Sequence, residues 1–131
     1  MATETPQVIN GNGFAVASLD DLGEGWGFRK VRKALGVTAF GVNAIVIPPG
    51  YATPRHCHEE QEELYFVHRG RIRFEFGDGS AHELGEGGLA RVDSQTIRRL
   101  RNVGDGDAIY LCAGGKDGYV GRDGQHFPDE E

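Results

Sequence analysis

Two histidines and an acidic run have the residue types and the spacing of a metal site. They lie in the stretch from Gly50 to Gly70, which reads GYATPRHCHEEQEELYFVHRG. His56 and His58 are two positions apart, so on an extended strand their imidazoles project from the same face. A carboxylate of residues 59–63, brought back on the next strand, would add an oxygen. Two imidazole nitrogens and one carboxylate oxygen suit a divalent transition metal.

The size and charge of the chain narrow the classes of protein that it can belong to. Its 131 residues are the length of one domain and are enough to bury a core. The formal net charge of −6 argues against nucleic acid as the main partner, because such proteins usually carry a basic footprint. No apolar run approaches the roughly 20 residues that cross a bilayer, and the N-terminus lacks the features of a secretory signal. We expect a cytoplasmic protein with no nucleic-acid or membrane partner.

The elements that must position the histidines are short strands. Residues 37–47, VTAFGVNAIVI, are rich in β-branched side chains and are followed by the turn sequence Pro-Pro-Gly. Residues 64–67 and 71–76 predict a hairpin around Arg69-Gly70. Further strands are predicted over residues 81–84, 88–92, 96–102 and 108–113. Closely spaced strands without a sustained helix predict an all-β barrel or a double-sheet jelly roll.

The two ends of the chain differ from this strand-rich centre. We expect residues 1–13 to form a flexible N-terminal arm, residues 14–115 the barrel domain, and residues 116–131 a polar C-terminal tail. His126 lies in that tail, and His68 and His82 lie near turns, so all three are expected to be solvated. Cys57 and Cys112 are too few for a disulfide scaffold and are read as small buried apolar residues.

The stretch from residue 50 to 70 resembles the first signature of the cupin superfamily. That signature is a Gly, five residues, His-x-His, three or four residues, a Glu, six residues and a Gly. It is matched at Gly50, His56, His58, Glu63 and Gly70. The resemblance covers residues 37–113 and implies a single-domain jelly-roll β-barrel (a double-stranded β-helix), usually dimeric. It also implies that His56, His58 and Glu63 are metal ligands.

The second cupin signature is only partly present. It normally runs Gly, five residues, Pro, x, Gly, two residues, His, three residues and Asn. Anchored on Asn102 it places Gly87 correctly, but Asp93, Gln95 and Arg98 stand where Pro, Gly and His are usual. In the family that His is the fourth metal ligand. Arginine has no acceptor lone pair and cannot replace it. Strand alternation puts Arg98 on the same face as Leu100 and Asn102, and the resemblance implies that this face points into the barrel.

A buried arginine beside a metal ion has a large electrostatic effect. A +2 ion and a +1 group about 5 Å apart repel by roughly 6 to 7 kcal/mol at an effective dielectric near 20. One hypothesis is that the metal binds and Arg98 holds an anionic group in an open coordination position. The other is that the metal site is weak or lost, and that Arg98 pairs with Glu63 across it.

The predicted function is that of a small cupin with one divalent transition metal and a pocket for a small anionic or oxygenated molecule. Arg98 and Tyr65 are the predicted substrate-binding residues. Tyr65 shares the strand face of Glu63, so it either lines the pocket or packs in the core. Metal-assisted oxygen insertion, isomerisation or decarboxylation would fit, and the alternative is a non-catalytic sensor or storage protein. No general base is visible beyond the ligands, so no catalytic residue is assigned and enzyme activity stays open. The residues do not distinguish Fe, Mn, Zn, Ni and Cu. The resemblance implies a homodimer.

Overall fold

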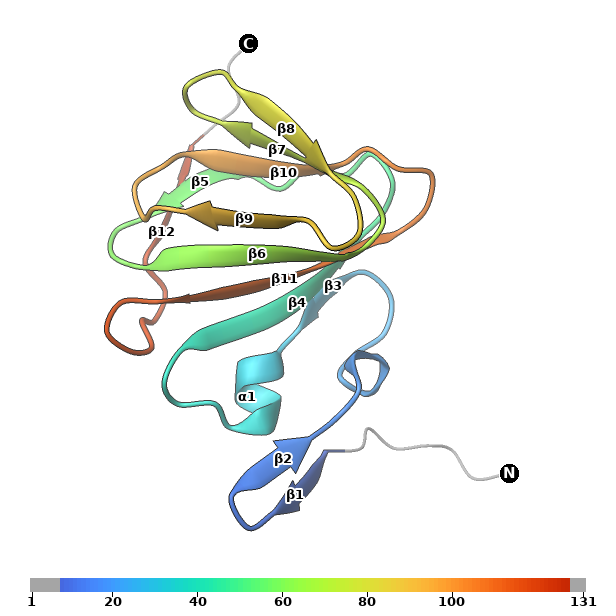
Figure 1. Cartoon of the computed structure of the whole chain (residues 1–131), viewed down its shortest axis with the longest axis vertical. Coiled ribbons are helices and arrows are strands. Elements are labelled where there is room, and N and C mark those ends of the chain that lie inside the picture. The colour runs from blue at the N-terminus through green and yellow to red at the C-terminus, as the bar shows by residue number, and fades with distance from the viewer. Residues whose placement is uncertain (1–7, 128–131) are drawn as a thin grey trace.

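The computed structural model describes residues 8–127, which form two five-stranded antiparallel sheets and a separate hairpin (Figure 1). The first sheet has the order β12-β5-β10-β7-β8, with the bounds Gly124–Phe127, Arg55–His58, Arg98–Asn102, Ile72–Phe76 and Ala81–Leu84. The second has the order β3-β4-β11-β6-β9, with the bounds Gly27–Arg29, Gly41–Ile47, Ala108–Gly115, Glu62–Arg69 and Leu89–Val92. The hairpin pairs β1 (Ile9–Gly11) with β2 (Phe14–Val16). The predicted all-β jelly roll is confirmed.

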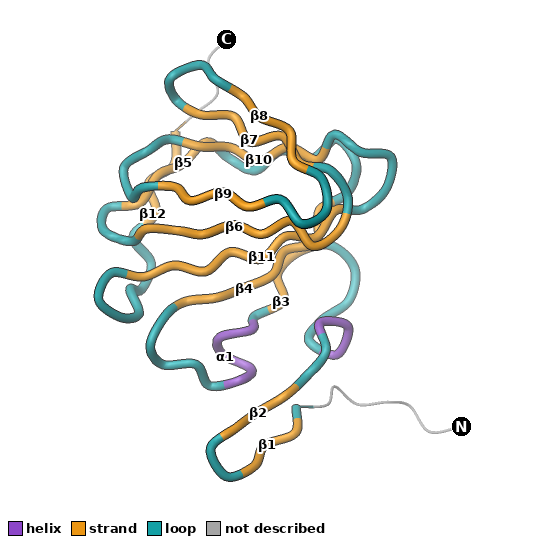
Figure 2. Tube along the Cα trace, in the orientation of Figure 1, coloured by secondary structure: helices purple, strands orange, loops and turns teal. Residues whose placement is uncertain are grey.

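Helix is confined to the N-terminal part of the described chain. A 3-10 turn covers Leu19–Asp21, and the five-residue helix α1 covers Val31–Leu35 (Figure 2). Gly36 ends the helix at φ +76°, a left-handed conformation that glycine adopts without strain. The sequence predicted a strand from residue 37, whereas β4 begins at Gly41. No described helix has the length and apolar character needed to cross a membrane.

The core fills the space between the two sheets. It is built from the inward residues of both, among them Ile45, Tyr65, Phe74, Leu100 and Tyr110. Buried residues alternate with exposed ones along β6 and with partly buried ones along β10, as the two-residue period of a strand requires. Burying each large apolar side chain stabilises the fold by about 1.5–3 kcal/mol. The predicted inward direction of Arg98 is confirmed, because Arg98 and Leu100 are 0% and 1% exposed.

Two motif residues hold the turns around the barrel. Asn102 is buried, and its side-chain amide donates to the carbonyls of Ile47 and Gly106 at 3.0 and 2.9 Å. Its Oδ1 accepts from Gly104 N at 2.9 Å, so the polar side chain is satisfied. Gly70 turns β6 into β7 at φ +88°, where an added Cβ would lie 2.9 Å from Ala108 Cβ. Only glycine fits that position.

The expected arm and tail both contain strands that the sequence did not predict. Residues 9–11 pair with residues 14–16, and residues 1–7 lie outside the described part. Within the expected polar tail, β12 pairs with β5 along its whole length, and residues 128–131 lie outside the described part. The segment GQHF is too short and polar to show strand periodicity. It is a strand because the edge of β5 offers it backbone partners.

Candidate functional site

His56, His58 and Glu63 meet at one end of the barrel. The two histidines lie on β5 in the first sheet, and Glu63 lies on β6 in the second. One potential ligand atom from each residue lies within 4.8 Å of those of the others. The two imidazole rings have centroids 5.3 Å apart and planes at 88°. The structure therefore brings together the three residues that the sequence singled out, as a group that could hold a metal ion.

Hydrogen bonds fix the direction of both imidazoles. His56 Nδ1 lies 3.0 Å from the Pro54 carbonyl, which can only accept, so this nitrogen carries the proton and Nε2 keeps its lone pair. Burial lowers the pKa of His56, and the nearby positive charge of Arg98 lowers it further. The hydrogen bond to Pro54 raises the pKa but does not offset these effects. A neutral imidazole is the form that binds a metal.

His58 is oriented by an aspartate far along the chain. Its Nδ1 donates to Asp123 Oδ1 at 2.8 Å. Its Nε2 is buried and has no hydrogen-bond partner among residues 8–127, although Glu63 Oε1 is 3.3 Å away. With Nδ1 protonated, a lone pair of Nε2 faces an acceptor oxygen. Two acceptors this close require a cation between them, either a second proton on His58 or a metal ion.

Asp123 is a site residue that sequence reasoning missed. Besides His58 it accepts from the backbone N–H groups of Glu60 and Gln61 at 2.8 and 3.1 Å, and from Gln61 Nε2 at 2.7 Å. Burial opposes its ionisation, but the bonds from Gln61, Glu60 and His58 hold the pKa of Asp123 well below its usual range. In sequence it is one aspartate in a polar segment, and no local pattern links it to a histidine 65 positions earlier.

Glu63 is held by two buried side chains. Its Oε1 accepts from Tyr65 OH at 2.5 Å and from an Arg98 NH2 hydrogen at 2.7 Å. Arg98 is fully buried and makes the ion pair that the sequence offered as one hypothesis. Burial of Arg98 opposes its charge, yet Tyr65 and Glu63 outweigh this effect and raise its pKa.

All but one of the remaining donors of Arg98 are already engaged. Its NH1 group donates to the carbonyls of Asp93, Ser94 and Thr96 at 3.1, 3.3 and 2.7 Å. Its Nε donates to Tyr65 OH at 3.3 Å. Of five N–H donors, a single NH2 hydrogen has no acceptor among the described contacts. The prediction that Arg98 and Tyr65 bind substrate stays a prediction, and the geometry limits Arg98 to about one hydrogen bond with a ligand.

The ionisation of Glu63 predicts an acid-sensitive contribution to stability. Burial opposes ionisation, but hydrogen bonds from His58, Tyr65 and Arg98 lower the pKa of Glu63 from 4.5 to about 2. Because the folded-state pKa is the lower one, the carboxylate stabilises the fold above pH 4.5 and loses this effect as the pH falls toward 2. The contribution is about 3 kcal/mol. Urea unfolding of chelator-treated protein at pH 6 and pH 3 measures the part of it, about 2 kcal/mol, that is lost by pH 3.

Glu63→Gln is the matched variant for that measurement. It should show a smaller loss of unfolding free energy between the two pH values than the wild-type chain, because the glutamine does not titrate. Equal losses in both proteins would show that Glu63 contributes nothing to acid sensitivity.

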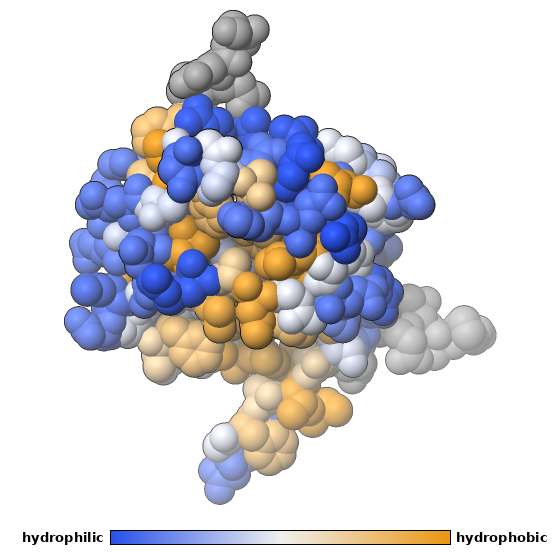
Figure 3. All heavy atoms as spheres, turned by 45° about the horizontal axis from the view of Figure 1, so that its top comes forward, coloured by the Kyte–Doolittle hydropathy of each residue, from blue (hydrophilic) through white to orange (hydrophobic). Residues whose placement is uncertain are grey.

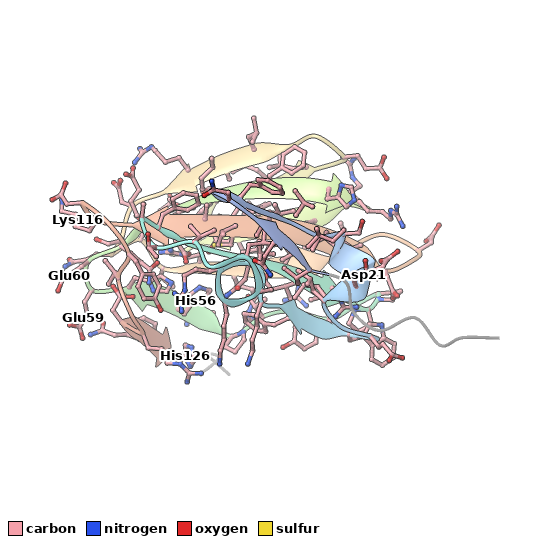
Figure 4. All side chains as sticks on the ribbon, turned by 90° about the horizontal axis from the view of Figure 1, so that it is seen from below. Asp21, His56, Glu59, Glu60, Lys116 and His126 are labelled. Atoms are coloured by element: carbon pink, nitrogen blue, oxygen red, sulfur yellow. The ribbon has the colours of Figure 1, made fainter. Side chains whose placement is uncertain are left out.

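Two further side chains border the site. Cys112 lies opposite Tyr65 in the register of β11 and β6, and burial together with the charge of Glu63 raises the pKa of its thiol well above the usual value. It is therefore a neutral thiol next to the site. His126 lies opposite His56 in the register of β12 and β5. Figure 4 shows His56 and His126 at the same end of the molecule as Glu59 and Glu60. The expected exposure of His68, His82 and His126 is confirmed.

Two surface cavities lie outside the histidine cluster. The larger, of about 510 Å³, is lined in part by Asp93, Ser94 and Thr96, whose carbonyls hold Arg98. The smaller, of about 330 Å³, lies beside Arg73 and Arg99. Neither is lined by His56, His58 or Glu63.

Comparison with known proteins identifies the family of this fold. The sequence model described as "Cupin domain" matches residues 44–114. No curated protein sequence matches the chain significantly. A cupin-superfamily sugar phosphate isomerase structure from Silicibacter pomeroyi is 27% identical with a TM-score of 0.62, over 68% of this chain and 58% of that one. The chain thus spans 58% of the length of that relative.

Two other solved structures show the same fold. A cupin protein from Bacteroides fragilis is 20% identical with a TM-score of 0.63, over 87% of this chain and 86% of that chain. A putative sugar phosphate isomerase from Acidithiobacillus ferrooxidans is 21% identical with a TM-score of 0.61, over 66% of this chain and 56% of that chain.

Proposed function

This chain belongs to the cupin domain family, and from that premise we propose that it binds one divalent transition metal ion through His56, His58 and Glu63. The observation that carries the proposal is the approach of His58 Nε2, an acceptor without a hydrogen-bond partner in residues 8–127, to Glu63 Oε1 at 3.3 Å. A metal ion held by His58 and Glu63 would give this nitrogen a partner. The donor set, two imidazoles and a carboxylate, suits Fe, Mn, Zn, Ni or Cu.

The charges around the site support binding of a cation in spite of Arg98. Glu63 is in contact with Arg98 and offsets its charge. Asp123 adds a second carboxylate behind His58 and stays ionised. With neutral imidazoles the cluster therefore carries one net negative charge. A carboxylate that accepts a hydrogen bond from the ring N–H of a ligand histidine also raises the basicity of the histidine and fixes its orientation.

The ion would supply Lewis-acid or oxygen-activating chemistry to a small anionic or oxygenated molecule. The chain's own residues divide the remaining work. Asp123 orients His58, while Tyr65 and Arg98 hold Glu63 through its Oε1. The 27% identical structure is a sugar phosphate isomerase, and this favours isomerisation over oxygen insertion and decarboxylation as the reaction to test first.

One observation favours a second candidate, a non-catalytic cupin that binds a small molecule without a metal. Arg98 and Glu63 already form a buried ion pair at 2.7 Å, so Glu63 is neutralised without an ion. A protonated His58 would then satisfy the close approach of its Nε2 to Glu63. The raised pKa of His58 agrees with this form, because burial lowers it but Glu63 and Asp123 more than compensate.

Metal titration separates the two candidates. Chelator-treated protein at pH 7.5 should bind one Co²⁺ or Zn²⁺ per chain in a calorimeter, and His58→Ala should weaken binding by about a hundredfold or more through loss of a ligand. His68→Ala, which removes an exposed imidazole on the outer face of β6, should bind as the wild type does. If the wild-type protein binds no ion, or if His58→Ala binds it as tightly as His68→Ala does, the result would support the metal-free candidate.

We also propose a cytoplasmic homodimer. The two cysteines are free thiols, as expected in a reducing compartment. Leu64 and Leu89 are 49% and 62% exposed on the outer face of β6 and β9. Hydrophobic residues gather on one face of the molecule and on the projecting hairpin (Figure 3). An exposed apolar patch of this kind suits a self-complementary interface.

Sedimentation velocity tests the dimer. Leu89→Glu should shift the protein toward the monomer, whereas Ala81→Glu, an exposed position on β8 in the other sheet, should leave the dimer intact. A wild-type chain that sediments as a monomer at all concentrations would contradict the proposal.

A further inference from the structure

The C-terminal strand β12 places a third imidazole on the ligand face of β5. His126 is the register partner of His56, and Gly124 is the register partner of His58. Directly opposite residues in an antiparallel pair project to the same side of a sheet. His126 therefore faces the same side as the two proposed ligands. Its ring centroid lies 6.0 Å from that of His56, with the ring planes at 86°.

The His126 side chain is exposed, while its backbone is paired with β5. The residue is exposed, and no hydrogen bond within residues 8–127 holds its ring. The strand itself is anchored to the site by Asp123, directly before β12. This residue accepts hydrogen bonds from His58 and from the backbone N–H groups of Glu60 and Gln61. An exposed imidazole on a backbone fixed close to the metal site would have a high effective concentration at that site.

The composition of β12 leaves this approach open. Gly124, opposite His58, has no side chain, and a Cβ built there would lie 3.7 Å from the His58 ring and 3.9 Å from the Cys57 carbonyl oxygen. Gln125 points to the other face, where it contacts Cys57 and Glu59. Among the described residues of this strand, His126 is thus the side chain that can reach the open side of the site.

We propose that His126 is an additional ligand of the ion that His56, His58 and Glu63 bind. The inference rests on the proposed function, since three protein ligands leave open positions on a transition metal and imidazole suits Zn, Cu, Fe and Ni. His126 lies outside the group of ligand atoms within 4.8 Å of one another, so its side chain would have to rotate toward His56 to reach the ion. The C-terminal strand then closes the metal site, and metal binding fastens this strand to β5.

Cobalt titration of the full chain tests the role of His126. The measurements are the dissociation constant of Co²⁺ and the visible absorption of the bound ion, which changes when a protein ligand is replaced by water. His126→Ala and His126→Gln should each weaken Co²⁺ binding by about tenfold to a hundredfold and alter the absorption spectrum. His68→Ala is the matched control, because it removes an exposed imidazole away from the site and should change neither quantity. Circular dichroism of each variant verifies the fold.

The outcomes distinguish failure of this inference from failure of the proposed function. If the wild-type chain binds Co²⁺ and both His126 variants match it within twofold with unchanged spectra, His126 is not a ligand, while the proposed three-ligand site stands. If the wild-type chain binds no Co²⁺, both proposals are wrong. A loss of affinity in His68→Ala equal to that in the His126 variants would also overturn the inference, because the effect would then come from surface imidazoles in general.

Discussion

Replacing Arg98 with alanine is expected to lower the free energy of unfolding of the chelator-treated protein by about 3–5 kcal/mol. The guanidinium is 0% exposed, and its loss would leave the Glu63 carboxylate buried without its charged partner. The carbonyls of Asp93, Ser94 and Thr96 would lose their donor at the same time. Urea unfolding at pH 7 measures the change, with the chelator present so that no metal ion substitutes for Arg98.

Arg91 provides the control for this experiment. It pairs with Glu62 and Asp93, but its side chain is 62% exposed. Exposed ion pairs contribute about 0–1 kcal/mol, so Arg91→Ala should unfold nearly as the wild type does. The double variant with Arg98→Met and Glu63→Gln removes both charges and should be more stable than Arg98→Ala alone. An unchanged unfolding curve for Arg98→Ala would show that the Arg98–Glu63 pair does not stabilise the fold.

Replacing Arg98 with histidine is expected to raise metal affinity by about a hundredfold or more. The substitution removes a positive charge whose repulsion of a +2 ion is roughly 6 to 7 kcal/mol at 5 Å and a dielectric near 20. Glu63 already offsets part of that repulsion, so about 3 kcal/mol of gain, or two orders of magnitude, is a conservative expectation. Arg98 is the register partner of His56, so an imidazole at this position would also face the ion. Calorimetric titration with Zn²⁺ measures the affinity, and anion binding should weaken in the same variant.

Arg98→Gln separates the two causes of that gain. Glutamine removes the charge without adding an imidazole, so its affinity should lie between those of the wild type and Arg98→His. Equal affinities for glutamine and histidine would assign the whole effect to charge. If neither variant differs from the wild type in metal or anion binding, Arg98 does not act on the ion and the proposed arrangement is wrong.

The fold and the position of the site were predictable because they depend on local patterns. Strand alternation put Arg98 and Leu100 on one face, and both are buried. The resemblance to the cupin signature singled out Glu63 as the partner of His56 and His58, and the three do meet. These inferences succeed because a two-residue period and a fixed spacing between turns depend on backbone geometry alone.

The contacts that the C-terminal segment makes at the site were not predictable in the same way. Asp123 and His126 lie in a segment that reads as a polar tail, yet one binds His58 and the other lies beside His56. Their contacts join residues that are far apart in sequence, 65 positions for Asp123 and His58, and depend on β12 docking at the edge of β5. A strand of this length has no stability of its own, so its partner in the folded protein decides whether it forms.

By itself, therefore, the sequence determined an all-β barrel, an inward-facing arginine, and a pair of imidazoles with a carboxylate close by. Only the packing of distant segments brings Arg98 and Tyr65 onto the carboxylate and pairs the final strand with β5. The difference has a physical reason. Side-chain direction along a strand is a local property, whereas hydrogen bonds and ion pairs between distant segments exist only after the two sheets have packed together.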